Sequence, residues 1–300
     1  MRHSSKAALI AAFCLVSAIA VWSAHSFVTP GPAKAHLLNR YIWSLPDPWF
    51  GGFSGFELSH DGKSFHAVTD RGRIVTGQIT RSDGRIRDIS VTSTNPLKND
   101  AGGDVTGNLN DSEGLALLPN GRIVVSFEFV QRIWLYDSPL DKAHWASYSK
   151  AWRAFATNIG FEALAVDDTG TVFAIPEGGR KTAPVFRWRH GEKWQQPFLY
   201  TLRGSFRPVG ADFGPDGKLY VLERAVSPFG FRSRIRQFDV TRTGFENDAV
   251  VFTSLPGKHD NLEGIALWQD DQDRIRITMI SDDNFRVFQR TEVVDYMLQE

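Results

Sequence analysis

The chain has 300 residues, of which 42% are hydrophobic and 12% are aromatic. Its 34 basic and 34 acidic residues give a formal net charge of +0, so no long-range field draws it to nucleic acid or to an anionic membrane surface. The composition excludes strongly charged binding classes and allows a sizeable core. We expect one large domain, a monomer, with a small molecule and not a nucleic acid as its partner.

Residues 1–25 have the layout of a secretory signal. Three basic residues precede an uncharged apolar run from Ala7 to Ala24, and a linker follows at 26–36. The run is about 18 residues long, close to the length that spans a bilayer, so a cleaved signal peptide and an uncleaved membrane anchor both remain open. We expect a periplasmic or secreted protein, or one anchored in the inner membrane and facing the periplasm, with its domain at 37–300. The only cysteine, Cys14, lies in the run, which excludes disulfides and cysteine chemistry elsewhere.

A short pattern recurs five times along the rest of the chain. Each copy places a tight turn between two apolar runs and has polar or acidic residues at both outer ends. The copies run from Ser54 to Arg71, Glu113 to Glu128, Glu162 to Glu177, Val209 to Arg224 and Glu263 to Asn284, with turns at Asp61-Gly62, Asn120-Gly121, Thr169-Gly170, Asp216-Gly217 and Asp270-Asp271. Such turns predict β-hairpins, in which the two outer ends meet at the end opposite the turn.

Two further strand-like stretches follow most of these hairpins. They are Arg73–Thr80 and Ile86–Thr92, Arg132–Asp137 and Trp152–Thr157, Pro184–Trp188 and Pro197–Leu202, and Arg234–Val240 and Ala249–Leu255. A four-stranded unit of about 50 residues is in the size range of a propeller blade. The pattern therefore predicts an all-β fold, a β-propeller of four-stranded antiparallel blades.

The fifth unit is short by one strand. It ends with Phe285–Gln289 and a tail from Thr291, and we expect Leu37–Leu45 to supply its missing outer strand and close the ring. Five units are counted, and a sixth, divergent blade in the loop Asn95–Asp111 or in the tail remains open.

The predicted ring gathers carboxylates at one mouth of a central channel. They are Asp70, Glu113, Glu128, Glu162, Glu177, Glu223, Glu263, Asp282 and Asp283, with Asp111 and Asp260 just upstream of two inner strands. So many acids raise one another's pKa unless basic side chains or a bound cation neutralise them. Ca²⁺ suits such a set because it takes six to eight oxygen ligands, and asparagines beside the acids would add neutral oxygens.

The acids differ in what surrounds them. Glu162 and Glu177 are expected to be structural, because Ala163 replaces the glycine of the other copies and a proline precedes Glu177. Glu113, Glu263 and the run 282–284 are expected to be functional, because each lies with further polar residues. The chain has no G-x-S-x-G, H-E-x-x-H, P-loop or G-x-G-x-x-G motif, so any catalysis would depend on carboxylates, arginines and a metal.

Several motifs in order resemble the phytase-like family, also described as having esterase-like activity of phytase. They are Phe53-Ser54-Gly55-Phe56, Thr69-Asp70-Arg71-Gly72, Asp111-Ser112-Glu113-Gly114, Gly160-Phe161-Glu162-Ala163-Leu164, Leu222-Glu223-Arg224, Asn261-Leu262-Glu263-Gly264 and Ser281-Asp282-Asp283-Asn284-Phe285. The resemblance implies a secreted or periplasmic β-propeller related to hydrolases of phosphate or other esters. The Asp-Asp-Pro-Ala signature of alkaline β-propeller phytases is missing, which argues against hydrolysis of phytate.

The first hypothesis is a hydrolase of phosphate or carboxylate esters that depends on a divalent metal, with Ca²⁺ favoured. A propeller that binds a ligand or partner without catalysis, and a lactonase, remain as alternatives. Three residues are assigned to catalysis, namely Glu113, Glu263 and Asp282, and three to substrate binding, namely Arg71, Arg224 and Asn284. The assigned metal ligands are Asp70, Asp111, Glu113, Glu128, Glu223, Asn261, Glu263 and Asp283.

Overall fold

The computed structural model describes residues 34–146, 149–154 and 159–299. The expected signal or anchor at 1–25 and most of the linker lie outside the described residues. Within the described part of the chain, no helix is both long enough and apolar enough to cross a membrane. The first strand, β1, begins at Ala35.

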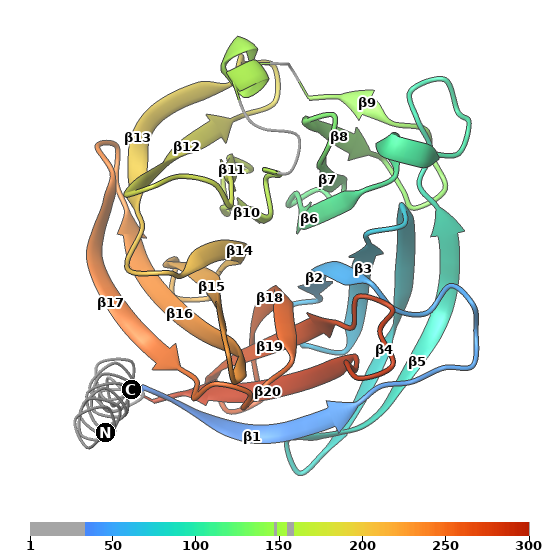
Figure 1. The fold of residues 1–300 in the computed structure, drawn as a ribbon, viewed down its shortest axis with the longest axis vertical. Helices are drawn as coiled ribbons and strands as arrows, with labels where there is room; N and C mark the ends of the chain where they lie inside the picture. Colours follow the sequence, from blue (N-terminus) through green and yellow to red (C-terminus); the bar gives the residue numbers. More distant parts are fainter. Residues whose placement is uncertain (1–33, 147–148, 155–158, 300) are drawn as a thin grey trace, which may run out of the picture. The chain divides into compact units, whose positions relative to one another are not determined.

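Five four-stranded antiparallel sheets stand around a central axis like the blades of a fan (Figure 1). Blade 1 contains β2 Phe53–Leu58, β3 Ser64–Thr69, β4 Arg73–Ser82 and β5 Arg85–Pro96, and blade 2 contains β6 Ser112–Leu117, β7 Ile123–Phe127, β8 Arg132–Tyr136 and β9 His144–Trp145. Blade 3 contains β10 Ala163–Val166, β11 Val172–Ile175, β12 Thr182–Trp188 and β13 Gln195–Thr201, and blade 4 contains β14 Arg207–Phe213, β15 Leu219–Ser227, β16 Gly230–Val240 and β17 Phe245–Thr253. Blade 5 contains β18 Asn261–Gln269, β19 Ile275–Asp282, β20 Glu292–Leu298 and β1 Ala35–Ile42. The all-β propeller prediction is confirmed.

The first strand of the chain closes the ring. β1 pairs antiparallel with β20, from Ala35 opposite Leu298 to Ile42 opposite Glu292, with one irregularity between Leu37 and Asn39. Blade 5 is thus built from both ends of the described chain, as predicted for Leu37–Leu45. β1 thus covers the outer edge of β20 and becomes the outermost strand of the blade.

The third strand of blade 5 lies later in the chain than expected. The expected strand Phe285–Gln289 is a turn region in which Phe285 has φ 51°, and β20 forms instead in the segment expected to be a tail. The left-handed backbone at Phe285 is incompatible with a strand, and Val287 and Phe288 are exposed. The first five residues of β20 are fully buried, because this strand lies between β19 and β1.

Blade 2 differs from expectation in its outer strand. The short strand β9 pairs with β8, whereas the expected strand began at Trp152. Trp152 lies in the 3-10 helix η2, Lys150–Ala154, where its indole packs edge-on against Phe161 with ring centroids 4.9 Å apart. The last part of the expected strand lies outside the described residues. The loop Asn95–Asp111 contains only the end of β5, an isolated bridge between Lys98 and Asp104, and the 3-10 helix η1, Gly107–Leu109, so it forms no sixth blade.

Five hydrophobic clusters form the core, and each lies between two neighbouring blades. The inner strands approach closely around the axis. A Cβ atom on Gly210 would lie 2.4 Å from the carbonyl oxygen of Glu263 in the next blade, so only glycine fits there. Full burial of each Leu, Ile, Val or Phe contributes about 1.5–3 kcal/mol, so the blade interfaces hold the inner strand ends in place.

A β-bulge occurs at the same place in four of the inner strands. The register shifts lie between Phe53 and Gly55, between Ser112 and Leu115, between Pro208 and Gly210, and between Leu262 and Gly264. A bulge inserts one extra residue and re-aims its side chain. The inserted residues include Glu113 and Glu263, so the bulges position two of the predicted site residues.

Candidate functional site

Two layers of side chains surround one end of the ring axis. The bulge layer is the residue just before the glycine or alanine of each inner strand, and comprises Ser54, Glu113, Glu162, Val209 and Glu263. The strand-end layer occupies one equivalent position toward the end of the second strand, inside that strand in blades 4 and 5 and just beyond it in the other three blades. It comprises Asp70, Glu128, Glu177, Arg224 and Asp282. Seven of these ten positions are acidic and one is basic. The predicted acidic mouth is therefore present, with a single arginine inside it.

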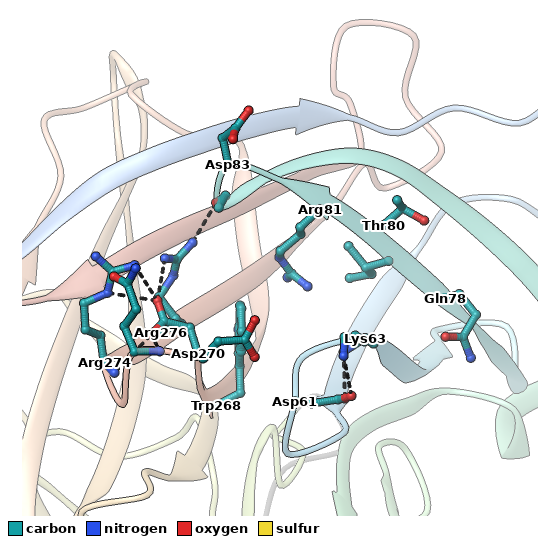
Figure 2. A pocket seen from close by; sticks show the side chains of 14 residues that line it. Asp61, Lys63, Gln78, Thr80, Arg81, Asp83, Trp268, Asp270, Arg274 and Arg276 are labelled. Atoms are coloured by element: carbon teal, nitrogen blue, oxygen red, sulfur yellow. Dashed lines mark hydrogen bonds and ion pairs between the residues drawn. The ribbon is translucent and has the colours of Figure 1, made fainter.

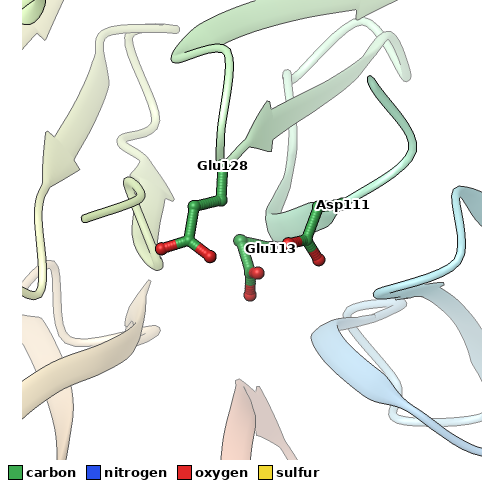
Figure 3. Close-up of side chains that lie close together, drawn as sticks. All are labelled: Asp111, Glu113 and Glu128. Carbon is green, nitrogen blue, oxygen red and sulfur yellow. The ribbon is translucent and has the colours of Figure 1, made fainter. Parts of the chain in front are cut away.

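The acids of blade 2 form the tightest group. Asp111, Glu113 and Glu128, which we call the blade 2 triad, each offer a carboxylate oxygen, and these oxygens lie within 4.8 Å of one another (Figure 3). Burial raises the pKa of Glu113 well above its usual value, and the charges of Asp111 and Glu263 raise it further. Burial and the charge of Asp111 raise the pKa of Glu128 to about 7. Within the described part of the chain, no ion pair neutralises this triad.

Asp70 of blade 1 adds a fourth carboxylate beside the triad. Burial raises the pKa of Asp70 to about 7, and the charges of Asp282 and Asp111 add to this shift. Its Oδ1 atom is buried and has no hydrogen-bond partner among the described residues. The chain passes close to it only because Gly52 has no side chain, since a Cβ there would lie 2.3 Å from Asp70 Oδ1. A buried carboxylate oxygen with no partner, beside three other acids, fits a hard divalent cation.

The equivalent residues of blade 5 are partnered. We call Asn261, Glu263 and Asp282 the blade 5 triad. Arg224 pairs with Glu263 and donates to Asn261 Oδ1 at 2.8 Å, while Asn261 Nδ2 donates to Glu263 Oε1 at 2.8 Å. Burial and the charge of Glu263 raise the pKa of Asp282 to about 8, although the backbone N–H of Asn284 donates to it. This side of the mouth contains both a guanidinium group and a carboxyl group that holds its proton near neutral pH.

Blade 3 contributes two acids that were expected to be purely structural. Burial raises the pKa of Glu162 well above its usual value, and the charges of Glu177 and Glu113 act in the same direction. Glu177 pairs with Arg224 at 3.0 Å, so it helps to hold that guanidinium in the mouth. Both residues therefore lie at the mouth, where the repeat placed them, in the positions of Glu113 and Glu128. The ion pair of Glu177 with Arg224 is compatible with the structural role that was expected of it.

Glu223 is not part of this group. Its carboxylate accepts hydrogen bonds from Tyr200 at 2.9 Å and from Arg236 at 3.1 Å, and it pairs with Arg234. In the register of blade 4, Glu223 lies opposite Pro208, and Arg224 occupies the strand-end layer. A shift of one residue reverses the face of a strand, so Glu223 points into the blade and Arg224 toward the axis. The metal-ligand role assigned to Glu223 does not fit this arrangement.

The loop after β19 has a supporting role. Asp283 Oδ1 accepts from the backbone N–H groups of Gly52 at 3.1 Å and Phe285 at 3.0 Å, and its Oδ2 accepts from the Thr291 hydroxyl at 3.1 Å. These bonds occupy the carboxylate that was assigned to the metal, so Asp283 fixes the loop. Asn284 is exposed at the rim. Arg71 is also exposed, and its guanidinium stacks over the ring of Phe285, 3.2 Å from the centroid.

A separate cleft of about 490 Å³ lies at the hairpin-turn end, between blades 1 and 5 (Figure 2). Its charged side chains are largely paired. Lys63 lies 3.3 Å from Asp61, and Asp270 accepts from Arg274 at 2.8 Å and from Arg276 at 3.1 Å. Arg276 also donates to the carbonyl of Gly84 in blade 1, so these pairs link the two blades.

The chain is similar to known proteins in both sequence and fold. A family model described as "Phytase-like: Esterase-like activity of phytase" matches residues 48–285. No curated protein matches the sequence. Among solved structures, the chain is similar to a PQQ-bound aldose sugar dehydrogenase from Streptomyces coelicolor, with 11% identity, a TM-score of 0.48 and coverage of 89% of this chain and 99% of that one.

Two other solved structures have comparable similarity. A putative gluconolactonase has 12% identity and a TM-score of 0.45, with coverage of 90% of this chain and 96% of that one. A luciferin-regenerating enzyme has 12% identity and a TM-score of 0.46, with coverage of 84% and 95%. At these values the structural similarities identify no activity for this chain.

Proposed function

The chain belongs to the phytase-like family, and on that premise we propose that it is a hydrolase that cleaves an ester at the acidic mouth of the propeller with the help of a divalent cation. The observation that carries the proposal is the blade 2 triad together with the unpartnered Oδ1 of Asp70. Four carboxylates without an ion pair among the described residues are costly unless protons or a cation neutralise them. Ca²⁺ is the favoured cation, because all the candidate ligands are oxygens.

The two sides of the mouth have complementary tasks in this proposal. Asp70 and the blade 2 triad would hold the cation, which when bound would orient a water molecule and polarise the ester as a Lewis acid, with a carboxylate of the mouth as the base. Arg224 faces them from blade 4 and would bind the negative charge that develops on the substrate. Asp282, whose pKa is raised to about 8, would donate a proton to the leaving oxygen. Glu263 holds Arg224 in place and faces the same space.

The charge of the mouth favours some esters over others. Seven acids and one arginine occupy the two layers, so a substrate with many phosphates would be repelled. Exposed phenylalanines border the same end of the ring, with Phe229 72% and Phe288 76% exposed. We therefore favour a carboxylate ester or a phosphate monoester with an apolar group over phytate. A periplasmic or secreted monomer, exported through residues 1–25, completes the proposal.

The test combines calcium titration by calorimetry with two release assays, on p-nitrophenyl butyrate and on p-nitrophenyl phosphate. We expect micromolar or tighter binding, release of nitrophenol from one of the two esters, and loss of release with a chelator. A γ-lactone serves as a third substrate, with its ring opening measured by the acid that is formed. Binding of Ca²⁺ without hydrolysis of either ester or of the lactone would favour a ligand-binding propeller. Release that is unaffected by the chelator would contradict the role of the cation.

A further inference from the structure

Exposed apolar side chains gather at the mouth end of blades 4 and 5, which are neighbours in the ring (Figure 1). Three connections carry them, and we call these the apolar rim: the hairpin tip 226–231 between β15 and β16, the segment 255–260 before β18, and the loop 285–290 before β20. The strongly exposed side chains of the rim are Val226, Phe229, Leu255, Val287 and Phe288. Among the described residues, the hairpin-turn end of the same two blades exposes no leucine, valine, isoleucine or aromatic side chain. A cluster of this kind on one face marks a surface that meets a partner.

The three segments of the rim are joined to one another. Gly257 donates its backbone N–H to the carbonyl oxygen of Phe231 at 2.9 Å, which ties the β15–β16 hairpin to the segment before β18. Asp260 accepts the backbone N–H of Arg290 at 3.0 Å and the side-chain amide of Gln289 at 3.1 Å, which ties that segment to the loop before β20. These bonds hold the exposed side chains on one surface, so they can meet a partner together.

The exposed charges of the rim are all positive. Lys258, Arg286 and Arg290 are exposed. Among the described residues, Lys258 and Arg286 form no ion pair, and Arg290 lies 3.4 Å from buried Glu292. Asp260 is the only acid in the three segments, and both of its oxygens accept the hydrogen bonds to the loop before β20. The rim therefore combines projecting apolar groups with positive charge that the protein leaves largely unneutralised.

We propose that the apolar rim docks onto an anionic lipid surface. Its apolar side chains would insert among the acyl chains, while the basic side chains beside them would contact acidic headgroups. The neighbouring acids Glu263 and Asp282 are buried in the mouth, so the charge exposed at this edge is the positive charge of the rim. Because the formal net charge of the chain is +0, this attraction acts only at close range, within about 8 Å at physiological ionic strength. Docking of this kind goes beyond the proposed hydrolysis and does not depend on it.

A second copy of the chain fits the rim less well than a lipid surface. Most oligomers close by two-fold symmetry, so the same patch of both copies would meet. The exposed basic side chains of one rim would then lie against those of the other, and juxtaposed like charges oppose association. An anionic lipid surface instead matches both the apolar groups and the charge.

The first experiment measures co-sedimentation of the full chain with vesicles in the presence of a chelator, so that no divalent cation links the mouth to the headgroups. We expect vesicles of phosphatidylglycerol and phosphatidylcholine in equal parts to bind at least about tenfold more tightly than phosphatidylcholine alone. The double variant Phe229→Ser with Phe288→Ser should bind the anionic vesicles at least about tenfold more weakly, because it removes the two largest inserted groups. Lys258→Glu with Arg286→Glu should remove the preference for anionic vesicles.

The matched control is Leu140→Ser with Leu199→Ser, which removes two exposed apolar side chains outside the rim. It should bind within about twofold of the wild type. All these side chains are exposed, so the thermal midpoint of each variant should equal that of the wild type and show that the fold is intact.

The second experiment reports on the rim alone, because the apolar run Ala7–Ala24 could also bind lipid. In a Cys14→Ser background, Phe288→Cys or Leu140→Cys carries the only cysteine and is labelled with a solvatochromic dye. Anionic vesicles should shift the emission of the label at position 288 to the blue and leave the label at position 140 unchanged.

Three outcomes would overturn lipid docking by the rim. They are wild-type binding in the Phe229→Ser with Phe288→Ser variant, an equal loss of binding in the Leu140→Ser with Leu199→Ser control, and an unshifted label at position 288. Sedimentation velocity without lipid supplies a fourth. A dimer that Phe229→Ser with Phe288→Ser dissociates would assign the rim to a second copy of the chain instead of a lipid surface.

Discussion

The triads of blade 2 and blade 5 occupy the same three positions of the repeat, yet their environments are opposite. The blade 5 triad has Asn261 where the blade 2 triad has Asp111, and it receives Arg224 from the neighbouring blade. Among the described residues the blade 2 triad has no ion pair, although the charge of Arg132 opposes the shift by which burial raises the pKa of Asp111, and one carboxylate oxygen of each acid lies within 4.8 Å of the others. One amide and one guanidinium group thus distinguish a side of the mouth with a basic partner from an acidic side, and in our proposal the first binds the substrate and the second the cation.

The largest expected effect comes from removing the central acid of the blade 2 triad. Glu113→Gln keeps the shape of the side chain but removes a ligand charge, so Ca²⁺ affinity should fall about 100-fold or more, and turnover should be lost. Calorimetry and the release assay measure both. Glu263→Gln should also abolish turnover, but it should leave Ca²⁺ affinity within about tenfold, because Glu263 belongs to the other triad.

The matched control for these variants is Asp141→Asn, an exposed acid in a loop of blade 2. It should bind Ca²⁺ and turn over substrate like the wild type. Thermal unfolding should show that Glu113→Gln and Glu263→Gln are folded. Full activity in either variant would show that the role assigned to that glutamate is incorrect.

Glu223 tests the difference between a buried acid that is partnered and one that is not. Glu223→Gln leaves the guanidinium group of Arg234 without its counter-charge and that of Arg236 with Asp248 alone, which should lower the free energy of unfolding by about 3 kcal/mol. The melting temperature should fall by roughly 6–12 °C while Ca²⁺ affinity stays unchanged. A loss of Ca²⁺ binding without a loss of stability would return Glu223 to the metal site.

The unneutralised acids also predict how stability depends on pH. The folded-state pKa values of Asp70 and Glu128 are raised to about 7, and that of Asp282 to about 8, so the folded protein binds more protons than the unfolded chain between about pH 4 and 8. Stability should therefore decrease as the pH rises through this window. In chelator, the melting temperature should drop by at least about 10 °C from pH 5 to pH 8. Saturating Ca²⁺ should flatten this slope, and an equal slope with and without Ca²⁺ would argue against a cation at these acids.

The smallest expected effect is a gain of function. The double variant Asn261→Asp with Arg224→Met gives the blade 5 triad three acids, as in the blade 2 triad, and removes the arginine that pairs with it. Calorimetry should then detect a second, weaker Ca²⁺ site, with a dissociation constant of roughly 10⁻⁴–10⁻³ M. Arg224→Met alone serves as the control, since it removes the arginine without adding an acid. A single site in the double variant would mean that blade geometry, and not charge, selects the blade 2 triad.

Most of the fold could be predicted from sequence because hairpin turns and strand alternation are local signals. The repeat predicted the five blades, since each inner hairpin depends on residues close to one another along the chain, and the closing strand was inferred because the fifth unit was short by one strand. The outer strand of blade 2 could not be predicted, because Trp152 packs against Phe161 of the next blade and not within its own. The position of β20 could not be predicted either, because its burial depends on pairing with β1 from the other end of the described chain.

The site was predicted as a group of acids, but their individual roles were not. The face of Glu223 depends on the bulge at Val209, and a one-residue shift in register is invisible without the pairing. Asp283 looked like a ligand by composition, yet its oxygens are occupied by a loop that only the folded chain brings together. The repeat position placed Glu162 at the mouth, and its expected structural role stays a prediction.

The pairing of β1 with β20 also determines when the molecule can finish folding. β1 emerges first during synthesis, yet its partner follows more than 240 residues later, on the order of tens of seconds at ordinary rates of translation. During this interval β1 is an unpaired edge, exposed to other chains. The ring therefore closes only after β20 has been synthesised. A chain that is truncated before β20 would leave β1 unpaired.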